Sequence, residues 1–421
     1  MKRSFILAGA GASALVLLSA ACAVDPESTE ESVEESRWKW PTHGHGGHTG
    51  TSSSSHSASS SSHASSSSAS SSSHSSSSSS SASSSSHSSS GAGAGTASSS
   101  SSSVSSSSSS SSSSGGGTVT GGLFTAKNPW NTAVAGETKS STSDAIINWL
   151  SSNGGWGGGA MQMDFSITVL KADSSTPLKT FTTTSSFYTP DCDHVPFPLP
   201  ATGSIEGESG FECTQGGDCH LLVVHTPTNK LYEMWKANVE NGTFYGGCTA
   251  VWDLNKTYPA SLRGDGCSSA DAGGFPIAGM LFTPDEVASG EIDHALRFIL
   301  PNSRIRGGDV FVHPGSHTTE STSGGADAPP YGVRFRLRAD YPLANLPSEG
   351  ARVIARAMQK YGMFLADGGT VALTGESDKY STHKYADMDI DSHSLKALAV
   401  KDFEVVEMGA LVSYDHDCHR N

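Results

Sequence analysis

The stretch His220–Leu254 reads HLLVVHTPTNKLYEMWKANVENGTFYGGCTAVWDL, and it decides the fold class. Short runs of apolar, aromatic and β-branched residues are typical of strands, and clusters of turn-forming residues separate them at Thr226–Lys230 and Glu240–Thr243. The pattern predicts a meander of three consecutive strands. A protein organised around such a meander is expected to be mainly β.

Further strands are expected on both sides of this meander. They are MQMDFSITVL (161–170), DVFVHP (309–314), YGVRFRLRA (331–339) and a hairpin in GMFLADGGTVALTG (362–375). Helices are fewer: SDAIINWL (143–150), a capped turn starting at Pro284, and SEGARVIARAMQKYG (348–362). This balance favours a β-sandwich or jelly-roll-like domain with a few inserted helices.

The segment GEIDHALRF, Gly290 to Phe298, places two carboxylates, a histidine and an arginine close together. Its apolar residues fit both a helical and a strand period, and the flanking Gly290 and Pro301 bound a short element, so we expect a strand beginning near Ile292. In that strand His294 lies on the apolar face, where burial favours the neutral imidazole. Arg297 lies on the opposite, polar face.

Three segments follow one another along the chain. Residues 1–22 have a basic start, an apolar run and small residues, as in an export signal. Residues 23–117 are acidic, then rich in His and Gly, then almost entirely Ser, and we expect them to form a disordered linker about 45 Å in mean span for the Ser-rich part. Residues 118–421 have the composition of a globular β-rich domain.

Cys22 ends LSAAC, which resembles a bacterial lipobox with the usual Leu displaced by one position. Two interpretations stay open: acylation of Cys22, which would anchor the protein to a membrane, and ordinary cleavage nearby, which would release it. Both predict a secreted or envelope-anchored protein. Membrane contact is expected only through this anchor.

The chain has seven cysteines, and six remain once Cys22 is assigned to the signal. An even number in an exported chain predicts disulfides, and Cys213 and Cys219 are close enough to close a small loop. The other pairings cannot be read from the sequence. The six candidates are Cys192, Cys213, Cys219, Cys248, Cys267 and Cys418.

The net charge of −15 argues against nucleic acid as a partner. No dinucleotide, P-loop, HExxH or GxSxG motif is found, so no cofactor is expected. A bound metal stays open but weakly supported. Its candidate ligands are the His-rich tract PTHGHGGHTG (41–50) and the pair His313 and His317.

Five residues are candidates for a catalytic site. His294 would act as base or acid, and Arg297 or Arg334 would neutralise an anionic sugar or oxyanion. His317 and Asp271 would complete the rim. A competing interpretation is that His294 is a packed core residue and that the polar strand face is solvated.

Several motifs in order, CSSADAGGFPIAG, GEIDHALRFILP, PPYGVRFRLRADYPL, YGMFLADGG and DFEVVE, resemble an uncharacterised family of secreted bacterial β-rich proteins. The resemblance covers most of Leu123 to Met408. It carries no activity and therefore assigns no role to a residue. The Ser-rich segment separately resembles linkers in exported polysaccharide-degrading enzymes.

These observations predict an exported protein that acts on an extracellular polysaccharide by hydrolysis or lyase-type cleavage. The alternative is a non-catalytic glycan-binding or adhesive surface module. In that case Tyr232, Trp235 and Trp252 would form a binding platform, although Trp252 is expected in the core.

Overall fold

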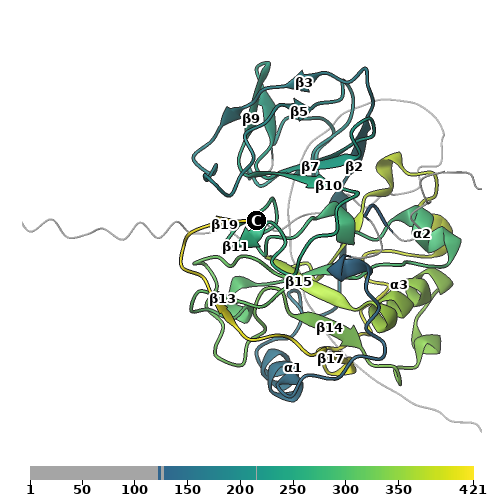
Figure 1. Ribbon diagram of the computed structural model, residues 1–421. Coiled ribbons are helices and arrows are strands. Elements are labelled where there is room, and N and C mark those ends of the chain that lie inside the picture. The colour runs from purple at the N-terminus through teal and green to yellow at the C-terminus, as the bar shows by residue number, and fades with distance from the viewer. Residues whose placement is uncertain (1–121, 125–127, 215) are drawn as a thin grey trace, which may run out of the picture. The chain divides into compact units, whose positions relative to one another are not determined.

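The computed structural model describes residues 122–124, 128–214 and 216–421 (Figure 1). The predicted export signal, the lipobox at Cys22, the His-rich tract and the Ser-rich linker all lie outside the described residues. Among the described residues, no helix is both long and apolar enough to cross a bilayer.

A mixed six-stranded sheet forms the larger part of the fold. In spatial order its strands are β1 (Met163–Ile167), β16 (Leu373–Glu376), β12 (Leu296–Leu300), β15 (Met363–Gly368), β14 (Arg334–Leu337) and β17 (Phe403–Val405). The pairs β1–β16 and β12–β15 are parallel, and the other neighbours are antiparallel. The central strand β12 is apolar except for Arg297 and is largely buried on both faces, as expected for a strand with neighbours on each side.

The stretch His220–Leu254 forms three strands of a second, four-stranded sheet. Its order is β10 (Thr249–Asp253), β7 (Lys230–Met234), β6 (Leu221–His225) and β2 (Val169–Ala172). The predicted first turn is confirmed between β6 and β7, which pair antiparallel. The predicted second turn is also confirmed, because Asn241 and Gly242 both have positive φ, as a tight hairpin requires.

The meander is more divided than the sequence predicts. The second turn joins β8 (Asn238–Glu240) to β9 (Thr243–Gly246), and this hairpin belongs to a separate sheet with β4 (Thr182–Thr183). The chain leaves the four-stranded sheet after β7 near Lys236, whose φ is +53°, and returns as β10 beside β7. Small two-stranded sheets complete the strands. They are β3 (Leu178–Lys179) with β5 (Phe197–Pro198), β11 (Gly264–Asp265) with β19 (His419–Arg420), and β13 (Val310–Phe311) with β18 (Val412–Ser413).

The predicted helices are confirmed. They are α1 (Ser143–Ser152), α2 (Pro284–Ser289) and α3 (Glu349–Lys360). Ser348 caps α3 through a hydrogen bond to the backbone of Ala351, and Thr283 and Glu286 form a capping box on α2. Short 3-10 helices among the described residues are η1 (Pro129–Asn131), η2 (Ala278–Met280), η3 (Asn302–Arg304), η4 (Leu343–Asn345), η5 (Asp378–Tyr380), η6 (Tyr385–Met388) and η7 (Val400–Asp402).

The described residues are richer in strand than in helix, which confirms the mainly β class. The largest core lies between the six-stranded sheet and the helices α1 and α3. Trp156 is at its centre, packs edge-on against Phe298 and Phe403, and donates its indole N–H to the carbonyl of Leu398 at 2.8 Å. Trp252 is fully buried in a second core, as expected.

The predicted hairpin in 362–375 is wrong. Strands β15 and β16 do run in opposite directions, but β12 lies between them, parallel to β15 and antiparallel to β16. The turn residues at Gly368 and Gly369 correctly predict a change of direction. They contain no information on a strand that arrives from elsewhere in the chain.

The predicted start of the strand near Ile292 is also wrong, because β12 begins at Leu296. The residues before it bond outside the sheet: the Ala295 N–H donates to the carbonyl of Trp130, and Asp293 pairs with Lys360. The polar face expected around Arg297 is not solvated either, since Arg297 is only 4% exposed.

All six predicted cysteines form disulfides. The pairs are Cys192–Cys248, Cys213–Cys219 and Cys267–Cys418, so the predicted small loop is confirmed. Three disulfides fit an oxidising, extracellular environment. The Cys267–Cys418 bond holds the C-terminal segment, which also pairs through β18 and β19.

The close packing beside Trp156 can be tested by a substitution at Gly157. A Cβ at Gly157 would overlap the backbone carbonyl of Thr370, whereas a Cβ at the adjacent Gly158 would contact only the side chain of Gln162 at 3.6 Å. We expect Gly157→Ala to lower the free energy of unfolding by about 1–3 kcal/mol through overpacking. Urea denaturation of both variants checks this, and equal stability of Gly157→Ala and Gly158→Ala would contradict it.

Candidate functional site

A cavity of about 720 Å³ opens beside the end of β15. Loops from distant parts of the chain supply its wall, together with the segment that follows β18. The lining residues are Tyr188, Thr189, Asp191, Asp218, Trp235, Ser268, Ser269, Ala270, Asp271, Ala272, Asn302, His317, Thr318, Thr319, Glu320, Ser321, Tyr331, Asp367, Gly368, Tyr414 and His416. The cavity has the size of a typical small-molecule or sugar site.

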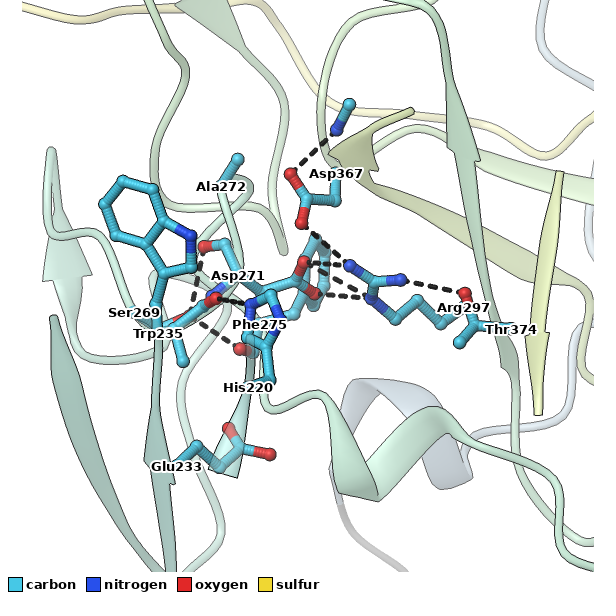
Figure 2. Close-up of polar contacts among 12 residues, drawn as sticks. His220, Glu233, Trp235, Ser269, Asp271, Ala272, Phe275, Arg297, Asp367 and Thr374 are labelled. Carbon is cyan, nitrogen blue, oxygen red and sulfur yellow. Dashed lines mark hydrogen bonds and ion pairs between the residues drawn. The ribbon is translucent and has the colours of Figure 1, made fainter. Parts of the chain in front are cut away.

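Arg297 faces two carboxyl groups at the base of this cavity (Figure 2). Its Nη2 donates to Asp271 Oδ1 at 2.8 Å and to Asp367 Oδ2 at 2.8 Å, so those two oxygens lie at most twice that distance apart. Its Nε also donates to Asp271, at 3.2 Å and 3.3 Å, and its Nη1 donates to Thr374 Oγ1 at 2.8 Å. The guanidinium therefore orients both carboxyl groups.

The sheet explains why these groups meet. Arg297 on β12 is directly opposite Thr374 on β16, and the register between β12 and β15 shifts by one residue just before Asp367. Such a bulge re-aims a side chain and leaves a backbone group free of the ladder. The carbonyl of Ala366 accepts instead from Gly273 at 2.7 Å, which draws the loop carrying Asp271 onto the sheet.

This loop consists largely of small residues, which permit close approach of another backbone segment. A Cβ at Gly274, whose φ is +81°, would overlap Ser316 Oγ, so another backbone segment does cross here. The disulfide from Cys267 fastens the same crossing. Ser269 Oγ donates to the carbonyl of Phe275 at 2.7 Å and accepts from the N–H of Asp271 at 3.0 Å, which fixes the loop's shape.

The two carboxyl groups are not equivalent. The Asp271 side chain is fully buried and makes the bidentate contact with Arg297, whereas the Asp367 side chain is 23% exposed. Burial and then the neighbouring charge of Asp271 raise the pKa of Asp367 to about 8, although Arg297 opposes the shift. Asp367 therefore keeps its proton near neutral pH and faces the cavity.

A buried histidine supports the loop from below. His220 Nδ1 lies 2.6 Å from Glu206 Oε2. Its Nε2 lies 3.0 Å from the carbonyl of Ala270, and Figure 2 shows His220 beside the loop that carries Asp271. Burial alone would lower the pKa of His220, but the charge and hydrogen bond of Glu206, together with nearby acids, outweigh it and raise the pKa to about 10. The charged imidazolium donates from both nitrogens and holds Ala270, the residue before Asp271.

His317 lies in the opposite protonation state. Its Nδ1 lies 2.7 Å from the carbonyl of Ala272, which can only accept, so in the neutral ring Nδ1 carries the hydrogen and Nε2 carries the lone pair. That Nε2 accepts from the Tyr414 hydroxyl at 3.3 Å. Burial lowers the pKa of His317, so the imidazole is neutral at neutral pH. The disulfide of Cys418 holds the segment that supplies Tyr414.

The structure brings three of the five predicted site residues together: Asp271 and His317 line the cavity, and Arg297 lies directly beneath Asp271. His294 lies elsewhere, in the wall of a second cavity of about 600 Å³. Its Nε2 is 3.2 Å from Glu286, which ties α2 to the segment before β12. Burial favours the neutral ring, as expected, but the charge and hydrogen bond of Glu286, together with the Ala295 carbonyl and Asp293, outweigh it and raise the pKa of His294.

Arg334 does not line the cavity. Its guanidinium donates to the carbonyls of Tyr361 at 2.7 Å, Pro129 at 3.2 Å and Thr132 at 2.7 Å, and it covers the ring of Phe364. Burial lowers the pKa of Arg334 to about 9. These contacts hold residues 129–132 against the six-stranded sheet.

Sequence reasoning missed Asp367 and His220. Asp367 had a usable signal, an acidic residue in LADGG at the end of an apolar strand, where functional side chains are common. His220 had none, because its partner Glu206 is joined to it only by the fold. Of the predicted binding platform only Trp235 lines the cavity, while Tyr232 and Trp252 are buried.

The predicted metal ligands do not share a site among the described residues. His313 contacts Asp265 at 2.7 Å, whereas His317 contacts Ala272 and Tyr414. Within the same residues, the one compact group of potential ligand atoms is Glu208, Cys213 and Cys219. Because these cysteines form a disulfide, they offer no thiolate to a metal.

Comparison with protein-family models, with curated proteins and with solved structures found no match to this chain.

The protonated Asp367 predicts how stability changes with pH. Its pKa is about 8 in the folded protein against an ordinary value of 3.8, so the folded protein holds a proton that the unfolded chain releases between these values. The free energy of unfolding should therefore fall as pH rises from about 5 to about 8. His220, with its raised pKa of about 10, acts in the same direction above pH 6.5.

Denaturation curves of the wild type and of Asp367→Asn across this range check the assignment. We expect a shallower decline for Asp367→Asn, since the amide does not titrate. Asp144→Asn removes a surface charge on α1 that is paired with Lys139, and it should keep the wild-type slope. Parallel curves for the wild type and Asp367→Asn would show that Asp367 is not the group responsible.

Proposed function

We propose that this protein hydrolyses glycosidic bonds of an extracellular polysaccharide, with Asp367 as general acid and His317 as general base. The observation that carries the proposal is that both side chains line one cavity, where Arg297 and Asp271 hold the carboxyl and Ala272 holds the imidazole. The surroundings raise the pKa of the carboxyl group and lower the pKa of the imidazole. Such opposite shifts are typical of the acid and the base of a catalytic pair.

Asp367 suits the role of acid. Its Oδ1 accepts from the N–H of Gly368 at 2.7 Å and its Oδ2 accepts from Arg297, so the carboxyl has a fixed orientation. A group with a pKa of about 8 is protonated near neutral pH and can give its proton to a leaving oxygen. Arg297 then stabilises the carboxylate that remains.

His317 suits the role of base. The carbonyl of Ala272 fixes the tautomer, which leaves the Nε2 lone pair to take a proton from water, and the bond to Ala272 stabilises the imidazolium that forms. Tyr414 donates to the same Nε2 and would have to turn away, or relay the proton, when water binds.

The cavity wall also suits a sugar. Tyr188, 53% exposed, and Trp235 present aromatic surface with polar tips, and hydroxyl and carboxyl groups surround them. The export signal and the tether expected from the sequence would place this domain outside the cell, anchored or released, and the three disulfides fit that environment. The jelly-roll-like sandwich stays a prediction on which this proposal does not depend; both larger sheets contain parallel neighbours.

Two other functions remain as outcomes of the test. A lyase would use His317 to remove a proton from a uronic acid, and a cation would have to neutralise the sugar carboxylate. A non-catalytic module would use Trp235 and Tyr188 to hold a glycan. Incubation of the full-length protein with neutral, amino and acidic polysaccharides separates these functions: new reducing ends indicate hydrolysis, unsaturated products indicate a lyase, and retention without products indicates a binder.

The acid and the base should have separate signatures in the kinetics. We expect Asp367→Asn and His317→Gln each to lower kcat by about 10²–10⁴-fold while the protein stays folded, and Asp144→Asn to behave as wild type. Activity should rise with pH as His317 loses its proton below pH 6.5 and fall near pH 8 as Asp367 loses its own. Full activity of either variant, or a flat pH profile, would rule out the pair.

A further inference from the structure

The charged side chains of the cavity wall are mainly acidic. Its lining includes the carboxyl groups of Asp191, Asp218, Asp271, Asp367 and Glu320, and no lysine or arginine occurs among the described residues that line it. Arg297 compensates Asp271, and Asp367 is protonated near neutral pH. Asp191, Asp218 and Glu320 therefore dominate the charge that a ligand meets.

The lysine and arginine side chains near these acids already have other partners. Arg297 is shared among two carboxyl groups and Thr374, so it has little capacity left for an anionic sugar. Arg263 and Arg420 each pair with the carboxylate of Asp193 and donate to backbone carbonyls. Lys236 lies over the ring of Trp235 at 4.4 Å and donates to Ser186.

The carboxylates of Asp191 and Asp218 can still accept further hydrogen bonds. Asp191 Oδ1 accepts from the N–H of Ser268 at 3.0 Å, and Asp218 Oδ1 accepts from the indole of Trp235. These bonds orient each carboxylate through one oxygen. The aromatic surfaces of Tyr188 and Trp235 lie in the same wall, and aromatic rings beside carboxylates attract organic cations.

A buried hydroxyl independently indicates a ligand. Thr318 lines the cavity, is 0% exposed, and its Oγ1 has no hydrogen-bond partner among the described residues. Buried polar atoms nearly always have a partner, so this hydroxyl requires one from a ligand or a water molecule in the cavity. A sugar hydroxyl or amine can supply it.

We propose that the cavity takes a polysaccharide whose sugars carry free, protonated amino groups, and that Asp191 and Asp218 bind these ammonium groups. The inference rests on the proposed hydrolysis and names its substrate class. The carboxylates would attract such a polycation and repel a polyuronate, and an N-acetylated sugar would lose the ion pairs.

The test compares three oligosaccharides of equal length: glucosamine oligomers, their fully N-acetylated form, and galacturonate oligomers. Binding is followed by tryptophan fluorescence and cleavage by reducing ends. We expect the free-amine oligomer to have a KM at least about 10-fold lower than either of the others, and this preference to weaken with added salt.

Charge-removing variants locate the preference. Asp191→Asn and Asp218→Asn should each raise the KM for the free-amine oligomer several-fold, with Asp144→Asn as the matched control outside the cavity, and thermal melts confirm that each variant is folded. Equal or better use of the N-acetylated or galacturonate oligomer overturns the inference but leaves hydrolysis standing. Tight binding of the free-amine oligomer without cleavage supports the inference and overturns hydrolysis. Failure of all three to bind overturns the inference, and hydrolysis is then decided by the neutral polysaccharides of the first panel.

Discussion

A buried guanidinium with two carboxyl partners is the constraint on which the site depends. Removing the charges of Arg297 and Asp271 from water is costly, and the cost is offset only where each charge has well-placed partners. Arg297 obtains them from β15, β16 and the loop carrying Asp271, so three parts of the chain must be in register at once. Burial and the charge of Asp271 outweigh the single charge of Arg297, so Asp367 keeps its proton near neutral pH.

The supports around this cluster have a common pattern. Three segments at the cavity are fixed by groups that do not themselves line it: His220 holds Ala270, Ala366 holds Gly273, and the Cys267–Cys418 disulfide holds the C-terminal segment. Groups that must keep a fixed orientation are commonly supported in this way. The arrangement leaves Asp367, His317 and the outer carboxylates as the groups available to a ligand.

Two histidines show that residue type alone determines neither the pKa of a side chain nor its place in the site. His294 and His317 were both candidates, yet their surroundings shift their pKa values in opposite directions. Glu286 lies 3.2 Å from His294 and favours its protonated form, whereas His317 contacts a carbonyl and a tyrosine and remains neutral. Only the second lines the larger cavity beside an acid of shifted pKa.

The sequence by itself determined what depends on neighbours along the chain. Alternating apolar residues predicted the strands β6, β7 and β14, capping residues predicted α2 and α3, and the even cysteine count predicted the disulfides. The tertiary structure decided what depends on distant partners. It placed β12 between β15 and β16, separated His294 from the cavity, and joined Arg297 to Asp271 and Asp367, which lie 26 and 70 residues away. Periodicity and turn signals extend over a few residues, so they assign an element and its faces but contain no record of which strand pairs beside it or which charge lies opposite.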